Sequence, residues 1–397
     1  MPSPTPFHSR TSALCKSYSW KQWSGYYAVT NYEVIHDLEY MAIRQAAGLL
    51  DVTPLCKYDI RGPGASDLVE WIFPRSFRKF AVGRIAYTPW CDSDGHVLDD
   101  GTVSRMAPDW WRVTSADPAR RWFEDCAQGF DVTIDDVTES MAALALQGPT
   151  SRAILKQVTE GIDFDKLKFF RLARGTIGGI DVVVSRTGYT GDLGYEIWTE
   201  NAGAETLWDT LMEGGKNYGI RPIGLMALDT SRIEAGFILK GVDYIGAKSS
   251  RIASQRYTPY EIGLGWCVNL KKPRFVGRDA VRKSVQSGLK RQIVGLDIDW
   301  PTLESLYDSM GLPPGVPGHA WRDCIPVYDA MGNWVGKATS GCWSPIVKKN
   351  LALATLEAAH TRPGSLVQIE WTIEGRRTSI PATVTATPFF NPERKVA

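Results

Sequence analysis

The chain contains few cysteines, and they form no recognisable pattern. Seven Cys are scattered over 397 residues, their number is odd, and no C-x-x-C pair occurs. We therefore expect neither a disulfide framework nor a structural zinc site, and we assign no metal ligands. This cysteine usage fits a reducing compartment, so we expect a cytoplasmic protein.

Long hydrophobic runs and an excess of one charge are also missing. No apolar run approaches the ~20 residues that span a bilayer, and residues 1–20 lack the apolar stretch of a secretory signal. Lys and Arg total 45 against 44 Asp and Glu, for a net charge of +1. A chain this neutral has no general attraction to nucleic acid or to anionic membranes, so we expect neither as a partner.

The sequence carries no dinucleotide-binding fingerprint. The segment 186–197, Arg-Thr-Gly-Tyr-Thr-Gly-Asp-Leu-Gly-Tyr-Glu-Ile, has glycines at three-residue spacing rather than as G-x-G-x-x-G. A strand is expected after it, so no helix N-terminus is available there to hold a phosphate. An oxidative enzyme with its own flavin or nicotinamide is therefore not expected. From spacing alone, the segment is a glycine-rich hairpin.

Enough apolar residues are present for a folded core, at 44% of the chain. Their periodicity predicts a helix over 31–50 that ends near Gly48, strands at 180–185 and 195–199, and a helix over 224–236. Strands and helices follow one another without a regular βαβ alternation, which favours an α+β fold.

The chain divides into regions of different character. Residues 1–30 are expected to be a loose N-terminal arm, and a boundary falls near residue 285. Beyond it, short strands with Gly and Pro turns predict a small β barrel or sandwich. The stretch 301–319 is rich in Pro and Gly, which predicts an insertion or linker loop.

Two pairs of charged residues stand out. On the expected helix 224–236, Asp229 and Arg232 share one face. The ordinary alternative is that they form a surface ion pair of little energetic importance. Asp99 and Asp100 are adjacent at the entry to an expected strand, where successive side chains point to opposite faces. At most one of these two carboxylates therefore faces a given pocket.

These segments resemble the folate-dependent glycine-cleavage T-protein (aminomethyltransferase) superfamily, nearest to its tetrahydrofolate-dependent demethylase branch. The resemblance covers nearly the whole chain. The motifs that carry it are 46–53 (AAGLLDVT), 82–88 (VGRIAYT), 95–100 (GHVLDD), 146–149 (LQGP), 186–197, 229–236 (DTSRIEAG), 261–266 (EIGLGW), 275–279 (FVGRD) and 339–354.

The resemblance implies an α+β protein built as a three-domain ring, with a small C-terminal β barrel. Residues 31–285 would form a folate-binding region of two intertwined domains, and residues 286–397 would form the barrel domain. Tetrahydrofolate would bind in a central channel as the cofactor.

Four positions match folate contacts of the family. Glu196 matches a pterin-binding glutamate, whose carboxylate can accept a ring N–H and an amino group side by side. Arg232 matches an arginine that contacts folate oxygens. Tyr87 matches a tyrosine beside the pterin, and Tyr189 lies in the same motif as Glu196. An outward-facing strand glutamate and a core tyrosine are the ordinary alternatives for Glu196 and Tyr87.

The pair Asp99–Asp100 matches the catalytic aspartate region of the family. A fixed carboxylate there can stabilise positive charge on the folate nitrogen that attacks a carbon, and can take its proton. We assign Asp100, with Asp99 as the alternative, because demethylase relatives more often keep only the second position acidic. Tyr244 is a candidate proton donor to the leaving group, with His36 and His96 as alternatives.

Segments 23–31 and 388–393 are similar to the demethylase and dimethylglycine-dehydrogenase side of the superfamily. Tryptophan is abundant, with 15 residues, and several flank the aspartate segment. Aromatic walls suit a methoxyarene by stacking or a methylated cation by cation–π attraction, although core packing is the alternative. We assign to a substrate pocket Trp90, Trp110, Trp111 and His36.

The resemblance thus implies a tetrahydrofolate-dependent one-carbon transferase. Its expected reaction is demethylation, which moves a methyl group from a small methoxyarene, sulfonium or ammonium to N5 of tetrahydrofolate. One alternative is the aminomethyltransferase of glycine cleavage, whose partner is a lipoyl carrier protein. The other is a folate-binding subunit that captures formaldehyde from a partner oxidase.

Overall fold

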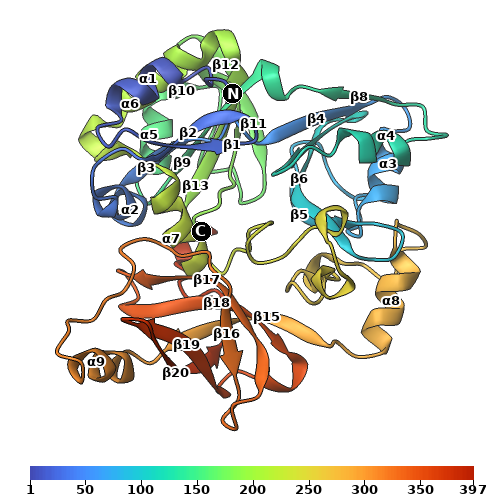
Figure 1. Ribbon diagram of the computed structural model, residues 1–397. Coiled ribbons are helices and arrows are strands. Elements are labelled where there is room, and N and C mark those ends of the chain that lie inside the picture. The colour runs from blue at the N-terminus through green and yellow to red at the C-terminus, as the bar shows by residue number, and fades with distance from the viewer.

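The computed structural model describes residues 1–397 and consists of three lobes, joined at the centre by irregular segments (Figure 1). The first lobe holds a seven-stranded sheet, the second a five-stranded sheet and the third a closed barrel of six strands. This arrangement confirms the α+β class and the three-domain ring with a C-terminal barrel. No helix is both long and apolar enough to cross a bilayer.

The sheet of the first lobe has strand order β10-β11-β12-β13-β9-β3-β14. Helices cover both of its faces. Its strands are β3 (Ala47–Asp51), β9 (Met141–Gln147), β10 (Thr159–Glu160), β11 (Leu172–Ile177), β12 (Ile180–Ser185), β13 (Gly194–Glu200) and β14 (Ile220–Pro222). The helices are α5 (Ser151–Val158) and α6 (Ala204–Gly214) on one face, and α2 (Asp37–Gln45) and α7 (Leu225–Glu234) on the other.

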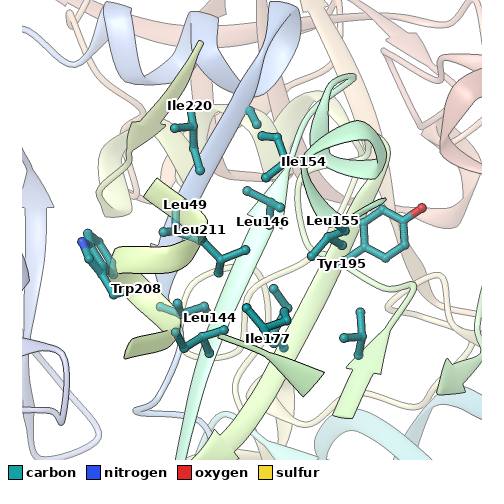
Figure 2. Packing of buried hydrophobic residues seen from close by; sticks show 14 of the residues in the cluster. Leu49, Leu144, Leu146, Ile154, Leu155, Ile177, Tyr195, Trp208, Leu211 and Ile220 are labelled. Atoms are coloured by element: carbon teal, nitrogen blue, oxygen red, sulfur yellow. The ribbon is translucent and has the colours of Figure 1, made fainter. Parts of the chain in front are cut away.

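Strand β9 shows why this sheet is apolar on both faces. Leu144 and Leu146 point into the core that α5 and α6 cover, where Figure 2 shows them with Trp208. Ala143 and Ala145 point into a second core beneath α2 and α7. A strand alternates its side chains between faces, so a strand covered on both sides is a continuous apolar run rather than an alternating one.

The first thirty residues are packed onto this lobe and do not form a loose arm. They form α1 (His8–Leu14) and a hairpin of β1 (Ser19–Trp23) and β2 (Tyr26–Asn31). Phe7 is fully buried in the main core, and its ring lies 6.0 Å from that of Trp208. Arg10 binds Asp209 of α6 at 2.7 Å. Phe7, Cys15 and Val29 of this segment all belong to the main core, which its polar composition did not indicate.

The helix expected over 31–50 is shorter than its apolar spacing indicates. It is α2, and residues 47–51 instead form β3, between β9 and β14. A Cβ on Gly48 would lie 2.7 Å from Ile223 Cδ1, so this glycine allows a close approach inside the sheet rather than ending the helix. Burial between two strands overrides the local helical periodicity here.

The second lobe packs its five-stranded sheet, of order β5-β6-β7-β4-β8, against two helices. The elements are β4 (Cys56–Arg61), β5 (Ile85–Cys91), β6 (Val97–Ala107), β7 (Trp110–Ser115), β8 (Thr133–Asp136), α3 (Ala65–Ile72) and α4 (Arg120–Cys126). Trp90 and Trp111 are 1% and 0% exposed in its core. Trp111 also donates its indole N–H to Ser66 at 3.1 Å.

The third lobe is a closed barrel with order β15-β18-β17-β16-β19-β20, connected to the second lobe through α8 (Arg278–Gln286). The strands are β15 (Arg291–Ile298), β16 (Ile325–Tyr328), β17 (Trp334–Ser344), β18 (Lys349–Glu357), β19 (Leu366–Ile373) and β20 (Arg376–Thr385). Half of the expected linker 301–319 is instead helical, in α9 (Trp300–Asp308). The Asp299 side chain caps this helix by accepting the Thr302 N–H at 3.0 Å.

A buried ionic network joins the first lobe to the barrel through α7, which Figure 1 shows at their junction. Arg44 of α2 pairs with Glu234 of α7 at 2.5 Å, and both side chains are fully buried. Glu234 also accepts the hydroxyls of Tyr40 (2.6 Å) and of Ser344 in β17 (2.5 Å). Because each charge is paired and hydrogen-bonded, the network can persist without water.

Replacing Phe7 with Ala should destabilise the protein by about 3 kcal/mol, because it empties a fully buried ring site against Trp208. Chemical denaturation followed by circular dichroism measures the loss. Val34→Ala is the control, since Val34 is 82% exposed and should change little. Equal stability of Phe7→Ala and the native protein would mean that the N-terminal segment is not packed.

Candidate active site

Asp100 of β6 lies at the centre of a cluster of tyrosines. Its Oδ2 accepts the hydroxyl of Tyr87 in β5 at 2.5 Å, and its Oδ1 accepts the hydroxyl of Tyr244. The pairing of β5 with β6 brings Tyr87 close, while Tyr244 arrives from the irregular segment after α7. Asp100 and Tyr244, which are 144 positions apart in the chain, are thus brought into contact by the fold.

Asp99 points to the other face of β6 and is nearly fully buried. Its Oδ1 accepts the backbone N–H of Asp100 at 2.8 Å, and its Oδ2 lies 2.8 Å from Nζ of Lys240. Asp100 is half-buried. Of the two carboxylates, Asp100 is therefore the one that the geometry leaves approachable, and Asp99 is held in place by a cation.

Burial controls the protonation of this cluster. It raises the pKa of Asp99 and of Asp100, while the tyrosine hydroxyls and Lys240 oppose the rise. Burial beside Asp100 also raises the pKa of Tyr87 and of Tyr244 well above the ordinary tyrosine range. Both hydroxyls therefore keep their protons and act as donors. Tyr244 directs its proton at Asp100, so it is not free in this state to protonate a leaving group.

Arg232 of α7 is buried between two carboxylates. Its Nε donates to Asp229 at 2.8 Å and its Nη1 to Asp243 at 2.5 Å. The third nitrogen, Nη2, is buried and has no hydrogen-bond partner. An unpaired buried guanidinium N–H is costly, so this donor marks a place for a ligand oxygen. The pair Asp229–Arg232 is thus a buried feature and not a surface ion pair.

Glu196 of β13 is half-buried and retains an unused acceptor. Its Oε2 accepts the hydroxyl of Thr187 at 3.0 Å, and Oε1 accepts no hydrogen bond from the protein. Burial raises the pKa of this carboxyl, while Thr187 and the cation of Lys57 oppose the rise. Lys57 is itself 1% exposed.

The glycine spacing of segment 186–197 has a packing cause. A Cβ on Gly188 or Gly194 would lie 2.0 or 2.2 Å from Oε1 of Gln147, and a Cβ on Gly191 would lie 2.4 Å from Cβ of Ala235. Gln147 is buried and fixed by hydrogen bonds to the backbone of this segment. The segment therefore folds over Gln147 and against α7, which brings Tyr189 and Glu196 to the same region.

Tyr189 faces α7 from this segment. Its hydroxyl donates to the carbonyl of Ile238, and its ring lies 5.5 Å from that of Phe237. Burial raises its pKa, and among the charges acting on it are Arg232 and Asp100. The structure thus brings Tyr189 together with Arg232 and the aspartate cluster.

The structure does not bring the four residues assigned to a substrate pocket together around Asp100. Trp90 and Trp111 are core residues because the β5–β6–β7 face that carries them is covered by α3 and α4. Trp110 lies against the guanidinium of Arg61, 3.8 Å from its ring centroid. His36 is buried at the start of α2, and His96 lies near Asp92 in the β5–β6 turn. None of the five is a hydrogen-bond partner of Asp100.

The aromatic residue that does lie beside the site is Trp266, in the short helix η6 (Gly265–Cys267). It is 65% exposed, and its ring stacks on that of Tyr87 at 6.5 Å between centroids. The guanidinium of Arg75 lies 5.5 Å from the same ring. Its motif, 261–266, was recognised in the sequence, but only the fold shows that it reaches Tyr87.

Comparison with known proteins identifies the family. Residues 7–272 match the GCVT N-terminal domain, and residues 311–391 match the glycine cleavage T-protein C-terminal barrel domain. The chain belongs to the glycine cleavage T-protein family. Proteins of this family are enzymes of the aminomethyltransferase type, and that family is tetrahydrofolate-dependent.

Relatives within the family carry two different names. The chain is 35% identical to a trimethylamine-oxide aldolase of Ruegeria pomeroyi, over 99% of this chain but 48% of that protein, so it spans about half the length of that relative. It is also 35% identical to an aminomethyltransferase of Symbiobacterium thermophilum, over 90% of each. The crystal structure of aminomethyltransferase T from Bartonella henselae has the same fold, with a TM-score of 0.83, 24% identity and coverage of 98% and 99%.

The residues of this T-protein family member fit a folate. The unpaired Nη2 of Arg232 offers a donor for a folate oxygen, and the free oxygen of Glu196 offers an acceptor for the amino and ring N–H groups of a pterin. Tyr87 and Tyr189 supply aromatic faces. The site therefore offers a folate a free N–H donor, a free carboxylate oxygen and two aromatic faces.

Gly188→Ala should destabilise the protein by roughly 1–3 kcal/mol, because the added methyl group meets a glutamine that cannot move away. Chemical denaturation measures this loss, and fluorescence titration should show weaker folate binding as the segment shifts. Gly318→Ala is the matched control, since a Cβ there meets nothing within 4 Å. Unchanged stability and binding in Gly188→Ala would contradict the packing account.

Proposed function

We propose that the protein is a tetrahydrofolate-dependent demethylase, which moves a methyl group from a small methylated cation to N5 of the folate. The observation that carries the proposal is the Asp100 carboxylate, which is held by Tyr87 and Tyr244 beside the stacked ring of Trp266. An anion next to exposed aromatic faces is suited to a cationic ammonium or sulfonium group.

When bound, tetrahydrofolate supplies the nitrogen that accepts the one-carbon unit. Glu196 and Arg232 hold the folate by complementary hydrogen bonds, and the aromatic face of Tyr87 supports its ring. Asp100 stabilises positive charge that develops on nitrogen, and it can accept the N–H proton at Oδ1 or Oδ2. Because the tyrosine hydroxyls are already fixed, this charge stabilisation needs little reorganisation.

The charge balance around Asp100 also favours a cationic donor. The ammonium of Lys240 pairs with Asp99 and Asp117, and Asp100 has no ion-pair partner of its own. A sulfonium or ammonium departs as a neutral group, so it requires no proton donor. A methoxyarene would need one, and Tyr244 already donates to Asp100. The relative named trimethylamine-oxide aldolase supports a methylated nitrogen compound as the donor class.

Aminomethyl transfer is the second candidate function. It is favoured by the aminomethyltransferase of Symbiobacterium thermophilum, which is matched over 90% of both chains. In that case a lipoyl carrier protein would be the partner and would present the aminomethyl group to the same Asp100. The third candidate function is capture of formaldehyde from a partner oxidase. It would use the same folate contacts without a methyl donor.

One panel of substrates distinguishes these functions. The protein is mixed with tetrahydrofolate and, separately, with a sulfonium propionate, glycine betaine, trimethylamine N-oxide, vanillate, or aminomethylated lipoyl carrier protein, and the folate products are identified by mass spectrometry. 5-Methyltetrahydrofolate from a cationic donor supports the proposal. Methylene-tetrahydrofolate from the carrier supports aminomethyl transfer. Tight folate binding without any reacting donor overturns both and favours formaldehyde capture.

Asp100→Asn should lower the rate of transfer by roughly 10²–10⁴-fold, because the amide neither accepts the proton nor stabilises positive charge. Folate affinity, measured by calorimetry, should change much less, since Glu196 and Arg232 remain. Asp94→Asn is the control, an exposed aspartate in the preceding turn. A fully active Asp100→Asn enzyme would rule out this role for Asp100.

The rate should also depend on pH in a defined direction. Asp100 must be ionised to accept a proton, and burial raises its pKa. The rate therefore falls as pH is lowered through a value above the ordinary aspartate pKa of about 4. Tyr87→Phe removes one hydroxyl donor that favours the ionised form, so it should move this limb to still higher pH. Measurement of kcat/KM from about pH 3.5 to 9 tests both expectations, and a limb near pH 4 contradicts them.

A further inference from the structure

The short segment 239–244 delivers three charged or polar side chains to the site. Lys240 reaches Asp99, Asp243 reaches Arg232, and Tyr244 reaches Asp100. Backbone hydrogen bonds from Gly241 N–H to Tyr244 O (2.7 Å) and from Asp243 N–H to the carbonyl of residue 239 (2.8 Å) hold it as a compact turn. The folate contacts and the aspartate pair are thus fixed by the same few residues.

Lys240 is the one member of this turn to which the proposed chemistry gives no role. Its Nζ lies 2.8 Å from Asp99 Oδ2 and 2.9 Å from Asp117 Oδ2, and its side chain is 13% exposed. A Cβ on Gly246 would lie 2.9 Å from Lys240 Cε, so the lysine stem packs closely against this glycine. The ammonium is therefore held at one place beside the aspartate pair.

A chain of contacts runs from this ammonium to the main chain of Asp100. Lys240 binds Oδ2 of Asp99, and Oδ1 of the same carboxylate accepts the N–H of Asp100. An ionised carboxylate is a stronger acceptor for that N–H than a protonated one. Without the cation, a nearly fully buried Asp99 beside Asp100 would tend to take up a proton, because burial and a like charge both disfavour its ionised form.

We propose that Lys240 is a positioning residue that favours the ionised form of Asp99 and fixes its carboxylate, so that Asp99 orients the main chain of Asp100, the residue that exchanges the proton. Lys240 does not touch the reacting atoms in this assignment. The inference rests on the proposed function only in giving Asp100 the proton-accepting role. It explains why two adjacent carboxylates can share one site with different tasks.

The other ionisable groups beside the Asp99–Asp100 pair are neutral near pH 7. Asp100 faces the hydroxyls of Tyr87 and Tyr244, and the charges of Tyr189 and Cys267 in their ionised forms would also act with it. Burial raises the pKa of all four, so they stay neutral near pH 7. Lys240 is then the cation that acts on Asp99 and Asp100. Asp117 is the second carboxylate that Lys240 binds.

The test follows the carboxyl carbons of ¹³C-labelled aspartates by NMR in the ligand-free protein, with Asp99→Asn used to assign the two signals. Burial raises the pKa of Asp99 to about 7 beside Lys240 and also raises that of Asp100, so both should titrate above the ordinary aspartate range. Lys240→Met should raise the titration of Asp99 by roughly 1–3 pH units, as expected for loss of an adjacent opposite charge. Lys240→Arg should restore it, and Lys248→Met, an exposed lysine a few residues away, should leave it unchanged.

Two results would overturn the proposal. They are a folded Lys240→Met protein that titrates like the native one, and a Lys240→Arg protein shifted as far as Lys240→Met. If Lys240→Met does not fold, Lys240→Gln tests the same loss of charge. If neither folds, Lys240→Arg still decides, because a shift in the titration of Asp99 although the charge is kept would contradict the proposal.

Kinetics provide a second, independent readout. The acidic limb of kcat/KM should move to higher pH in Lys240→Met and return in Lys240→Arg, which a purely structural role would not produce. The titration needs no substrate, so a failure of the Lys240 proposal can be told apart from a failure of the proposed function. If the NMR shift occurs but no methyl donor reacts, the role of Lys240 stands and the proposed function fails.

Discussion

The buried pair of Arg44 and Glu234 is the interaction on which the arrangement of the lobes depends. It links α2 to α7, and Glu234 binds Ser344 of the barrel at 2.5 Å. Asp192, from the glycine-rich segment, lies 3.4 Å from Arg44 and binds Arg394 near the C-terminus at 2.7 Å. Removing one member would leave a buried charge unpaired, which typically costs about 3–5 kcal/mol.

Helix α7 carries this network on one side and the ligand-facing groups on the other. Within it, Glu234 belongs to the structural network, while Arg232 holds Asp229 and Asp243 and keeps one buried N–H unused. Asp243 is in turn bound by Thr339 and Ser340 of β17, both at 2.7 Å. The barrel therefore supports Arg232, the proposed folate contact, through Asp243, and residues of all three lobes build the candidate site.

The separation of roles within the aspartate pair follows from strand geometry and one cation. Successive residues of β6 face opposite ways, so Asp100 meets the two tyrosines and Asp99 meets Lys240. The proposed methyl transfer needs a carboxylate that is ionised but not neutralised by a fixed cation. Asp100 meets this requirement because its partners are neutral hydroxyl donors.

The sequence by itself determined the family, the α+β class, the barrel, and the residues Asp100, Glu196 and Arg232 as candidates, because motifs and strand periodicity are local. It also placed strand β12 at its observed bounds, 180–185. Only the tertiary structure decided that Trp90 and Trp111 are core, that Trp266 stacks on Tyr87, and that the N-terminal segment is packed. These facts depend on which segments far apart in the chain cover one another, and no local pattern encodes that coverage.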